Sequence, residues 1–149
     1  MSGLGIQFGG GAFGGESIST IEAVLRFAGQ RQLVLLNNVA NWNTPGFKAA
    51  DLPESEFQRA LTDAIQRRSS GSDPLSIRAG GRIGSEGPGL FRVAPIDANT
   101  GSMRHDGNTV VIDQEQIKLL KNAMTVQVFN RLLARQYRAL RTAIAGRVI

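Results

Sequence analysis

The side chains that most often carry catalysis or bind metal ions are scarce in this chain. Its 149 residues include no cysteine and a single histidine, which excludes disulfides, thiolate nucleophiles and cysteine-based zinc or iron–sulfur sites. That histidine, His105, stands in a turn-rich stretch, and we interpret it as a surface residue. Glu54 and Glu56 are close in sequence, but positions i and i+2 do not share a helix face. The sequence therefore predicts no enzyme, no catalytic residue, no cofactor and no metal site.

The most distinctive polar side chains belong to an asparagine-rich string. Asn37, Asn38, Asn41 and Asn43 fall within seven residues and precede Thr-Pro-Gly. Asparagine suits the end of a helix, which accounts for Asn41 and Asn43, and Pro-Gly suits the centre of a type II turn. Asn37 and Asn38 lie off the apolar seam described below. Their amides are therefore candidates for hydrogen bonds to a neighbouring helix.

The glycines show which elements position this string. Seven of the 18 glycines lie in the first fifteen residues and eight lie between residues 71 and 107. Glycine-rich stretches do not readily propagate a helix. The two glycine-poor blocks, residues 19–43 and about 113–145, are therefore the expected long helices, and the first fifteen residues are expected to form a flexible tail.

The first block has a start signal and a heptad pattern. Ser19-Thr20-Ile21-Glu22 matches a capping box. Apolar residues recur every seven positions, with a second set three residues earlier, as in a coiled-coil seam. The two sets are Ile21, Ala28, Leu35 and Trp42, and Ile18, Leu25, Gln32 and Val39. We expect Leu25, Leu35 and Val39 to pack against a partner helix.

The second block opens with Asp113 as the expected N-cap and also carries heptads. The expected packing residues are Leu119, Val126, Phe129, Leu133 and Leu140. A further apolar stripe runs beside them, formed by Ile117, Leu120, Met124, Val128 and Leu132. Because one partner helix cannot cover both stripes, the pattern predicts an assembly component.

The residues between the blocks carry weaker signals. The spacing of Phe57, Leu61 and Ile65 indicates a short amphipathic helix over residues 54–67. Apolar and polar residues alternate at 75–79 and again at 91–93, a pattern that allows a small hairpin. The expected fold is mainly α, with two long N- and C-terminal helices packed as an antiparallel coiled coil and a glycine-rich, largely irregular middle segment.

Positive charge is concentrated near the C-terminus. The chain has 17 Lys and Arg against 12 Asp and Glu, and residues 116–149 hold seven basic residues and no acid. Arg131, Arg135 and Arg138 share one helical face. This basic face suits a solvated surface, a contact with acidic neighbours in an assembly, or nucleic acid. No apolar run approaches the roughly 20 residues that span a bilayer, and a secretory signal pattern is missing.

The string Asn38-Val39-Ala40-Asn41-Trp42-Asn43-Thr44-Pro45-Gly46-Phe47-Lys48-Ala49 closely resembles the N-terminal signature of bacterial flagellar axial proteins. The family pattern is Asn-Ile-Ala-Asn, a small residue, Asn or Asp, then Thr-Pro-Gly-Tyr-Lys-Ala. Within that family the chain is similar to the basal-body rod proteins, on the proximal rod branch, over about residues 20–66 and 105–146. Trp42 and the glycine-rich first fifteen residues depart from the pattern. The resemblance marks one set of residues as an assembly motif: Asn37, Asn38, Asn41, Trp42, Asn43, Thr44, Pro45, Gly46 and Phe47.

The resemblance implies a structural role. Residues 18–47 and 110–149 would form a helical inner domain behind a tail of residues 1–17, and residues 48–109 would project as a middle excursion. Many copies, arranged helically, would form the rod, the drive shaft that transmits torque across the periplasm. Export would use the flagellar type III apparatus without a cleaved signal peptide. The implied partners are further copies of the chain, FlgC-like rod proteins, FliE and the MS ring, with no small-molecule substrate.

Two other functions remain open on the residues alone. One is a basic coiled-coil protein associated with nucleic acid, for which the basic face is the argument. The other is a soluble helical export chaperone or adaptor, which would bind its partner in a stable one-to-one complex. The scarcity of aromatic residues on the basic face argues against nucleic acid.

Overall fold

The computed structural model describes residues 15–69, 75–78, 80–87, 90–98 and 104–146. Residues 1–14, most of the expected tail, lie outside the described residues. The elements, in chain order, are α1 (Gly15–Ala40), β1 (Ala50–Asp51), α2 (Glu54–Ser69), β2 (Ile83–Gly87), β3 (Leu90–Val93), β4 (Ile96–Asp97) and α3 (Ile112–Ile144). The prediction of a mainly α fold with two long terminal helices is confirmed. Within the described part of the chain, no helix is long and apolar enough to cross a membrane.

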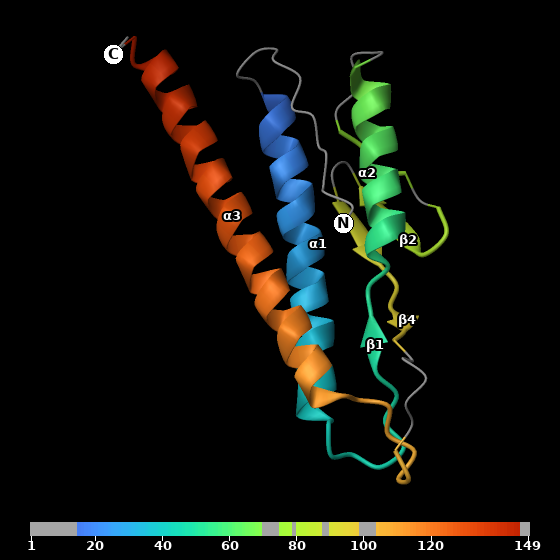
Figure 1. Ribbon diagram of the computed structural model, residues 1–149. Helices are drawn as coiled ribbons and strands as arrows, with labels where there is room; N and C mark the ends of the chain where they lie inside the picture. Colours follow the sequence, from blue (N-terminus) through green and yellow to red (C-terminus); the bar gives the residue numbers. More distant parts are fainter. Residues whose placement is uncertain (1–14, 70–74, 79, 88–89, 99–103, 147–149) are drawn as a thin grey trace, which may run out of the picture.

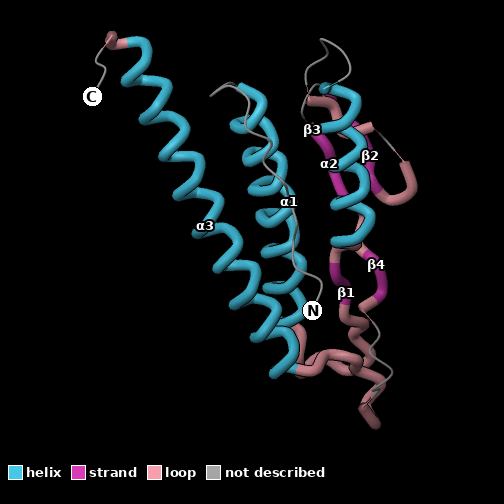
Figure 2. Tube along the Cα trace, turned by 45° about the horizontal axis from the view of Figure 1, so that its top comes forward, coloured by secondary structure: helices cyan, strands magenta, loops and turns pink. Residues whose placement is uncertain are grey.

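Helix α1 lies at the centre of the molecule (Figure 1). Helix α3 runs beside it in the opposite direction, and the two are closest where α1 ends and α3 begins. Helix α2 and the strands lie on the other side of α1, an arrangement that the tilted view in Figure 2 also shows. One long helix is therefore shared by two packing partners.

Both expected helix starts are wrong in detail. Helix α1 begins at Gly15, so Ser19 lies inside the helix, where its hydroxyl accepts a hydrogen bond from Arg68 Nη1 at 2.6 Å. Helix α3 begins at Ile112 after Val111, an N-cap residue without a side-chain cap bond, so Asp113 lies in the first turn. An acidic residue there still favours the helix, because it complements the positive end of the helix dipole.

The hydrophobic core lies between α1, α2 and the hairpin. Three phenylalanine rings form its centre, with Phe27 stacked on Phe57 at 4.2 Å and Phe57 on Phe91 at 5.5 Å between ring centroids. The whole cluster is Ala23, Phe27, Leu52, Phe57, Leu61, Ala64, Leu75, Ile77, Ile83, Phe91 and Val93. Most of these residues belong to the middle of the chain, which packs on α1 and carries more regular structure than its glycine content indicated.

The short helix and the hairpin are both present, but the hairpin uses a different first strand. Helix α2 covers the predicted residues 54–67 and two more. Strand β3 pairs with β2, with Ile83 opposite Val93 and a register shift near Ser85. Residues 75–78 are not a strand, although Leu75 and Ile77 are buried. Strands β1 and β4 form a second, two-residue antiparallel pair.

Candidate assembly site

The asparagine-rich string lies where α1 ends and α3 begins. We call this region the junction and define it as residues 38–51 together with residues 104–115. Asn38 is fully buried in it. Its Nδ2 donates to Ala50 O at 2.6 Å and to Glu115 Oε2 at 2.8 Å, and its Oδ1 accepts from Ala50 N at 3.1 Å. Asn38 thus bonds a neighbouring helix, as its position off the seam suggested, and that helix belongs to the same chain.

A second buried asparagine, Asn108, holds the turn after α1. Its Nδ2 donates to the carbonyl oxygens of Asn41, Trp42 and Thr44, at 3.0, 3.2 and 2.7 Å. Its Oδ1 accepts from Val110 N at 2.7 Å. One amide therefore bonds three carbonyls that follow the end of α1, where helical hydrogen bonding stops. In the sequence, Asp106-Gly107-Asn108 is typical of a turn and gives no sign of these distant partners.

Backbone contacts complete the junction. Gly46 N donates to Asp106 O at 3.0 Å, and Thr109 N donates to Phe47 O at 3.1 Å. Gly46 and Gly107 both have positive φ, 71° and 78°, a region that side chains rarely tolerate. A Cβ on Gly107 would also lie 3.6 Å from the Gly46 Cα. The Pro-Gly turn is therefore fastened to the segment that leads into α3.

Several members of the predicted motif remain on the surface. Trp42, Asn43, Thr44 and Pro45 are exposed. The Trp42 ring has one cationic neighbour, the Arg104 guanidinium, 5.6 Å from the ring centroid. Asn37 is also exposed, and among the described residues it bonds Asn41, whose Nδ2 donates to the Asn37 carbonyl at 2.9 Å, rather than another helix. The motif is thus divided into two parts. Asn38 belongs to a group of buried polar residues that also includes Asn108, which we call the lock, and Trp42, Asn43, Thr44 and Pro45 form an exposed edge.

Charged residues reinforce the lock. Arg31 binds Asp51 through two hydrogen bonds of 2.8 and 2.9 Å and also pairs with Glu54. Lys118 Nζ lies 2.7 Å from Glu115 Oε1 and 3.7 Å from Asp51 Oδ2. Burial acts to raise the pKa of Asp51, but the hydrogen bond and charge of Arg31, with help from Lys118, hold it below its usual value. Asp51 is therefore ionised at neutral pH.

The predicted seam is well packed at the junction and opens away from it. Leu35 is fully buried, and Asn122 is buried with its Nδ2 donating to Ala28 O at 2.9 Å and to Gln32 Oε1 at 2.7 Å. Most of the predicted packing residues are partly buried: Leu25, Val39, Leu119, Val126, Phe129 and Leu133. Leu140, in the last turns of α3, is 44% exposed. A groove of about 710 Å³ lies between the helices beside Leu33 and Val126.

The outward face of α3 has no cover among the described residues. Ile117, Leu120, Met124 and Val128 are all more than half exposed. The three residues of the predicted basic face, Arg131, Arg135 and Arg138, are exposed too. Apolar stripes of this size on a helix indicate a contact with another molecule.

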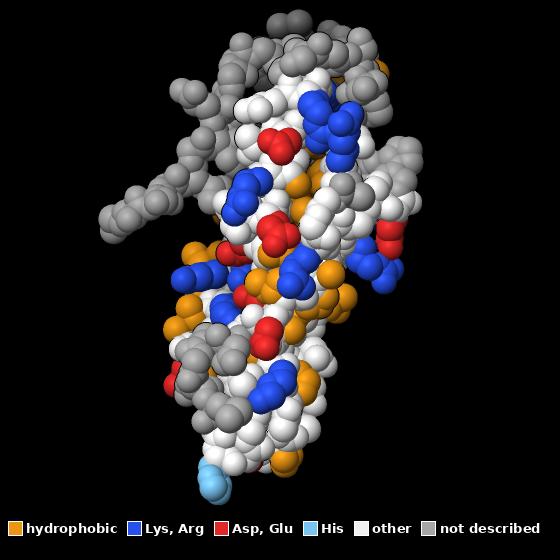
Figure 3. All heavy atoms as spheres, turned by 90° about the vertical axis from the view of Figure 1, so that its right-hand side faces the viewer, with side chains coloured by type: hydrophobic (Ala, Val, Ile, Leu, Met, Phe, Trp, Pro, Cys, Tyr) orange, Lys and Arg blue, Asp and Glu red, His pale blue; other side chains and the backbone are white. Residues whose placement is uncertain are grey.

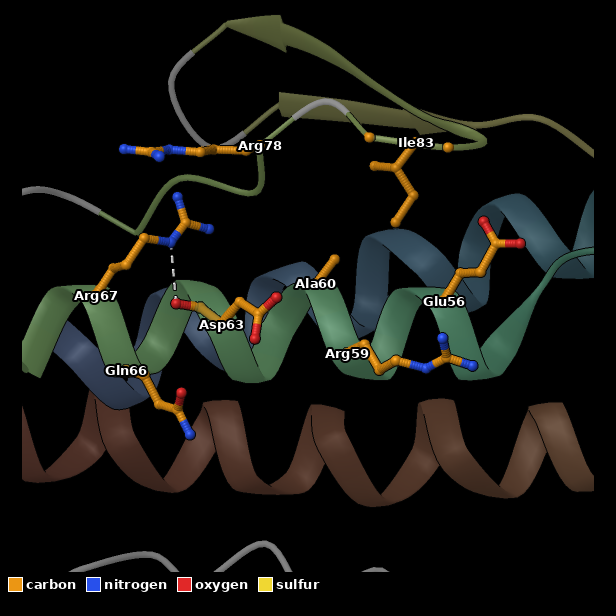
Figure 4. Close-up of a pocket in the computed structure, with 10 residues that line it drawn as sticks. Glu56, Arg59, Ala60, Asp63, Gln66, Arg67, Arg78 and Ile83 are labelled. Carbon is orange, nitrogen blue, oxygen red and sulfur yellow. Dashed lines mark hydrogen bonds between the residues drawn. The ribbon is translucent and has the colours of Figure 1, made fainter.

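The α2 side of the molecule carries charges of both signs, interspersed over the surface (Figure 3). A cleft of about 740 Å³ lies between α2 and the segment leading into β2. In it Arg67 and Arg78 lie near one end and Glu56 near the other (Figure 4). Arg67 Nε donates to Asp63 O at 3.1 Å. No group of three potential metal ligands occurs among the described residues.

The fold and the junction together describe a helical protein whose two long helices are joined by buried polar contacts at one end, with exposed apolar residues along α3. No family model matches the chain. It is 33% identical over 118 residues to the flagellar basal body rod protein FlgB of Aeromonas hydrophila, covering 78% of this chain and 83% of the relative. Its identity to FlgB of Cereibacter sphaeroides is 34% over 117 residues, covering 78% and 84%. The identity to FlgB of Salmonella typhimurium is 26% over 137 residues, which cover 87% of this chain and 98% of the relative.

The chain therefore belongs to the FlgB family of flagellar basal body rod proteins. The prediction of a structural component of the bacterial flagellar basal-body rod is confirmed at this level. The family is one of structural proteins, which agrees with the predicted lack of enzymatic function.

Proposed function

We propose that this chain forms part of the proximal rod and associates with its neighbours through its terminal helices. In this proposal α1 and α3 form an antiparallel coiled coil, the inner domain, and residues 48–109 form a middle excursion that packs on α1. Many copies and neighbouring rod proteins would together make the helical shaft that transmits torque. The uncovered face of α3 is the single observation that carries the proposal, because it needs a partner outside the chain.

Rigidity at the junction supports a role in torque transmission. A shaft that carries torque must resist changes in the angle between its helices. Asn38 joins α1 to β1 and α3, and Arg31 joins α1 to Asp51. Buried polar contacts of this kind hold a single geometry, since any displacement leaves a polar atom without a partner.

The exposed parts of the motif and of α3 supply the proposed contacts. Trp42, Asn43, Thr44 and Pro45, which are exposed, and Phe47, which is half-buried, would meet a neighbouring subunit at the junction end. The basic face of α3, Arg131, Arg135 and Arg138, would meet acidic side chains. The proposed partners are FlgC-like rod proteins, FliE and the MS ring, reached by type III export without a cleaved signal peptide, in a rod that spans the periplasm.

The experiment that tests this proposal locates the chain in the cell. In a strain lacking the gene, the chain should restore motility and should be recovered with purified basal bodies. Recovery in the cytosol, in a one-to-one complex with an exported protein, would instead support a chaperone. Nucleic-acid binding that falls steeply with salt, without recovery in basal bodies, would support the nucleic-acid alternative.

A further inference from the structure

The groove beside Leu33 and Val126 opens where α1 and α3 diverge away from the junction (Figure 1). Its volume is about 710 Å³, and the surface that lines it is mostly apolar. Leu33 is 70% exposed, and Gly29, one turn before it, leaves open space, because a Cβ built there meets no atom within 4 Å. The two helices therefore present an apolar hollow that the described residues do not cover.

Polar side chains of α3 border the same groove. Gln127, Asn130 and Arg131 line it, and their side chains make no hydrogen bond or ion pair among the described residues. A helix lying in the groove would not need these groups, because its backbone is already paired. An extended segment would need them, since its backbone N–H and C=O groups lack partners of their own. The groove therefore suits an extended segment with apolar side chains on one face.

The residues that precede α1 in the sequence have this pattern. Leu4, Ile6 and Phe8 alternate with glycine and glutamine, so an extended chain would place the three apolar side chains on one face. No charged side chain occurs among residues 1–15, so none would have to be buried in the groove. Residues 9–11 are all glycine, which allows the chain to reverse direction before α1.

Length and attachment allow this segment to reach the groove. The apolar face of residues 4–8 would be about 13 Å long at about 3.3 Å per residue. Residues 123–134 of α3 border the groove over about 16 Å. The seven steps from Phe8 to Gly15, where α1 begins, span at most about 23 Å. Gly29 lies about 21 Å along α1 from Gly15, so the segment can fold back along the helix and enter the groove.

We propose that residues 4–8 dock in the groove between α1 and α3 of their own chain, with their three apolar side chains against Leu33 and Val126. The proposal concerns the single chain and does not depend on the proposed rod function. Burial of apolar surface drives the docking. The tether favours the same chain over a second copy, because it holds the segment at an effective concentration of about millimolar. The docked segment would join the two helices where they diverge.

Cysteine cross-linking can test the docking in the full chain, because the natural chain contains no cysteine. Ile6→Cys with Leu33→Cys should form a disulfide within one molecule when the purified protein is oxidised at low concentration. The matched control is Ile6→Cys with Ile65→Cys, at an exposed position of α2. The end of α2 lies beside the start of α1, since Arg68 Nη1 donates to Ser19 Oγ at 2.6 Å. An undocked segment would therefore reach Ile65 as readily as Leu33.

The relative rates of the two disulfides decide the proposal. We expect the Leu33 pair to react at least about tenfold faster than the Ile65 pair, because docking raises the local concentration of one thiol at the other. Equal rates, or a faster reaction at Ile65, would show that the segment does not dock in the groove. A disulfide-linked dimer in place of the monomeric product would overturn the choice of the same chain. Recovery in basal bodies, which tests the rod function, is a separate measurement.

Substitution of Gly29 tests the groove while leaving the segment unchanged. Gly29→Leu should fill the groove and slow the disulfide between positions 6 and 33 about tenfold. Gly29→Ala is the matched control, because its Cβ enters open space, and it should leave the rate within about twofold. Both changes favour a helical backbone, so a slower reaction in Gly29→Leu would not come from loss of the helix. An unchanged rate in Gly29→Leu would show that the segment docks elsewhere.

Discussion

The two ends of the α1–α3 pair are stabilised in different ways. The junction end and the seam beside it bury five polar residues, Asn38, Asn108, Thr109, Glu115 and Asn122. Within the described part of the chain, every buried side-chain nitrogen or oxygen has a hydrogen-bond partner. At the other end, Leu140 and Ile144 are exposed, and a single hydrogen bond joins Tyr137 to Glu22.

This difference distinguishes the contacts that the single chain makes by itself from the contacts that need a neighbouring molecule. A buried polar group has one satisfactory arrangement, because losing its partner is costly, so the junction has a fixed geometry without help from neighbours. Apolar helix surface is not directional and accepts any well-fitting cover. We call the end of the pair near Leu140 and Ile144 the open end. It is the part where contacts with a neighbouring molecule contribute most to stability.

The largest expected effect is on the junction, through Asn108→Ala. The change removes the acceptor of the Val110 amide and the donor that the carbonyls of Asn41, Trp42 and Thr44 share. Each of these carbonyls keeps one other donor, from Thr44 N, Arg104 Nη1 and Phe47 N respectively. We expect the free energy of unfolding to fall by about 3 kcal/mol, measured by urea denaturation. Asn43→Ala, at an exposed position, is the control and should change it by less than about 0.5 kcal/mol. Similar losses in both variants would contradict the idea of a buried lock.

A smaller effect on stability, but a large one on assembly, is expected for Leu133→Asp on the open part of the seam. Leu133 is only partly buried in the single chain, so stability should fall by no more than about 1.5 to 3 kcal/mol. Because the change recurs in every copy, recovery in basal bodies should be lost. Normal recovery of the exported variant in basal bodies would show that assembly does not bury Leu133 away from water.

Acid should affect the junction before the open end, through Asp51. The folded-state pKa of Asp51 is lowered, so its contribution is present above the unfolded pKa, about 3.9, and is lost as the pH falls through the folded value. The expected observation is a stability that declines below about pH 4, and Asp51→Asn should flatten this decline. Unfolding measured in urea from pH 6 to pH 3 tests it. An unchanged slope in the variant would assign the acid sensitivity to other carboxylates.

The smallest expected effect is that of Arg135→Gln on the exposed basic face. An exposed contact of this kind contributes about 0 to 1 kcal/mol, so the rod should still assemble, with greater sensitivity to salt. Basal bodies washed at low and high salt provide the measurement. Loss of nucleic-acid binding in this variant, together with normal recovery of Leu133→Asp, would favour the nucleic-acid alternative over a rod component.

Local patterns in the sequence determined the regular elements. The heptads predicted both long helices and the burial of Leu35, and the spacing of Phe57 and Leu61 predicted α2. The Pro-Gly dipeptide predicted the turn in which Gly46 has positive φ. The lack of cysteine and the shortage of histidine excluded most enzyme chemistry. These features depend on residues within a few positions of one another, which is why a sequence can reveal them.

Only the tertiary structure decided how distant segments meet. Asn108 binds carbonyls 64 to 67 residues away, and Asn122 binds Ala28 O 94 residues away. The stacking of Phe27, Phe57 and Phe91, which places the middle of the chain on α1, also joins three separate elements. An asparagine has the same local preferences whether its amide meets water or a buried carbonyl. Its partner is set by the packing of the whole chain, so the lock at the junction could not be read from local spacing.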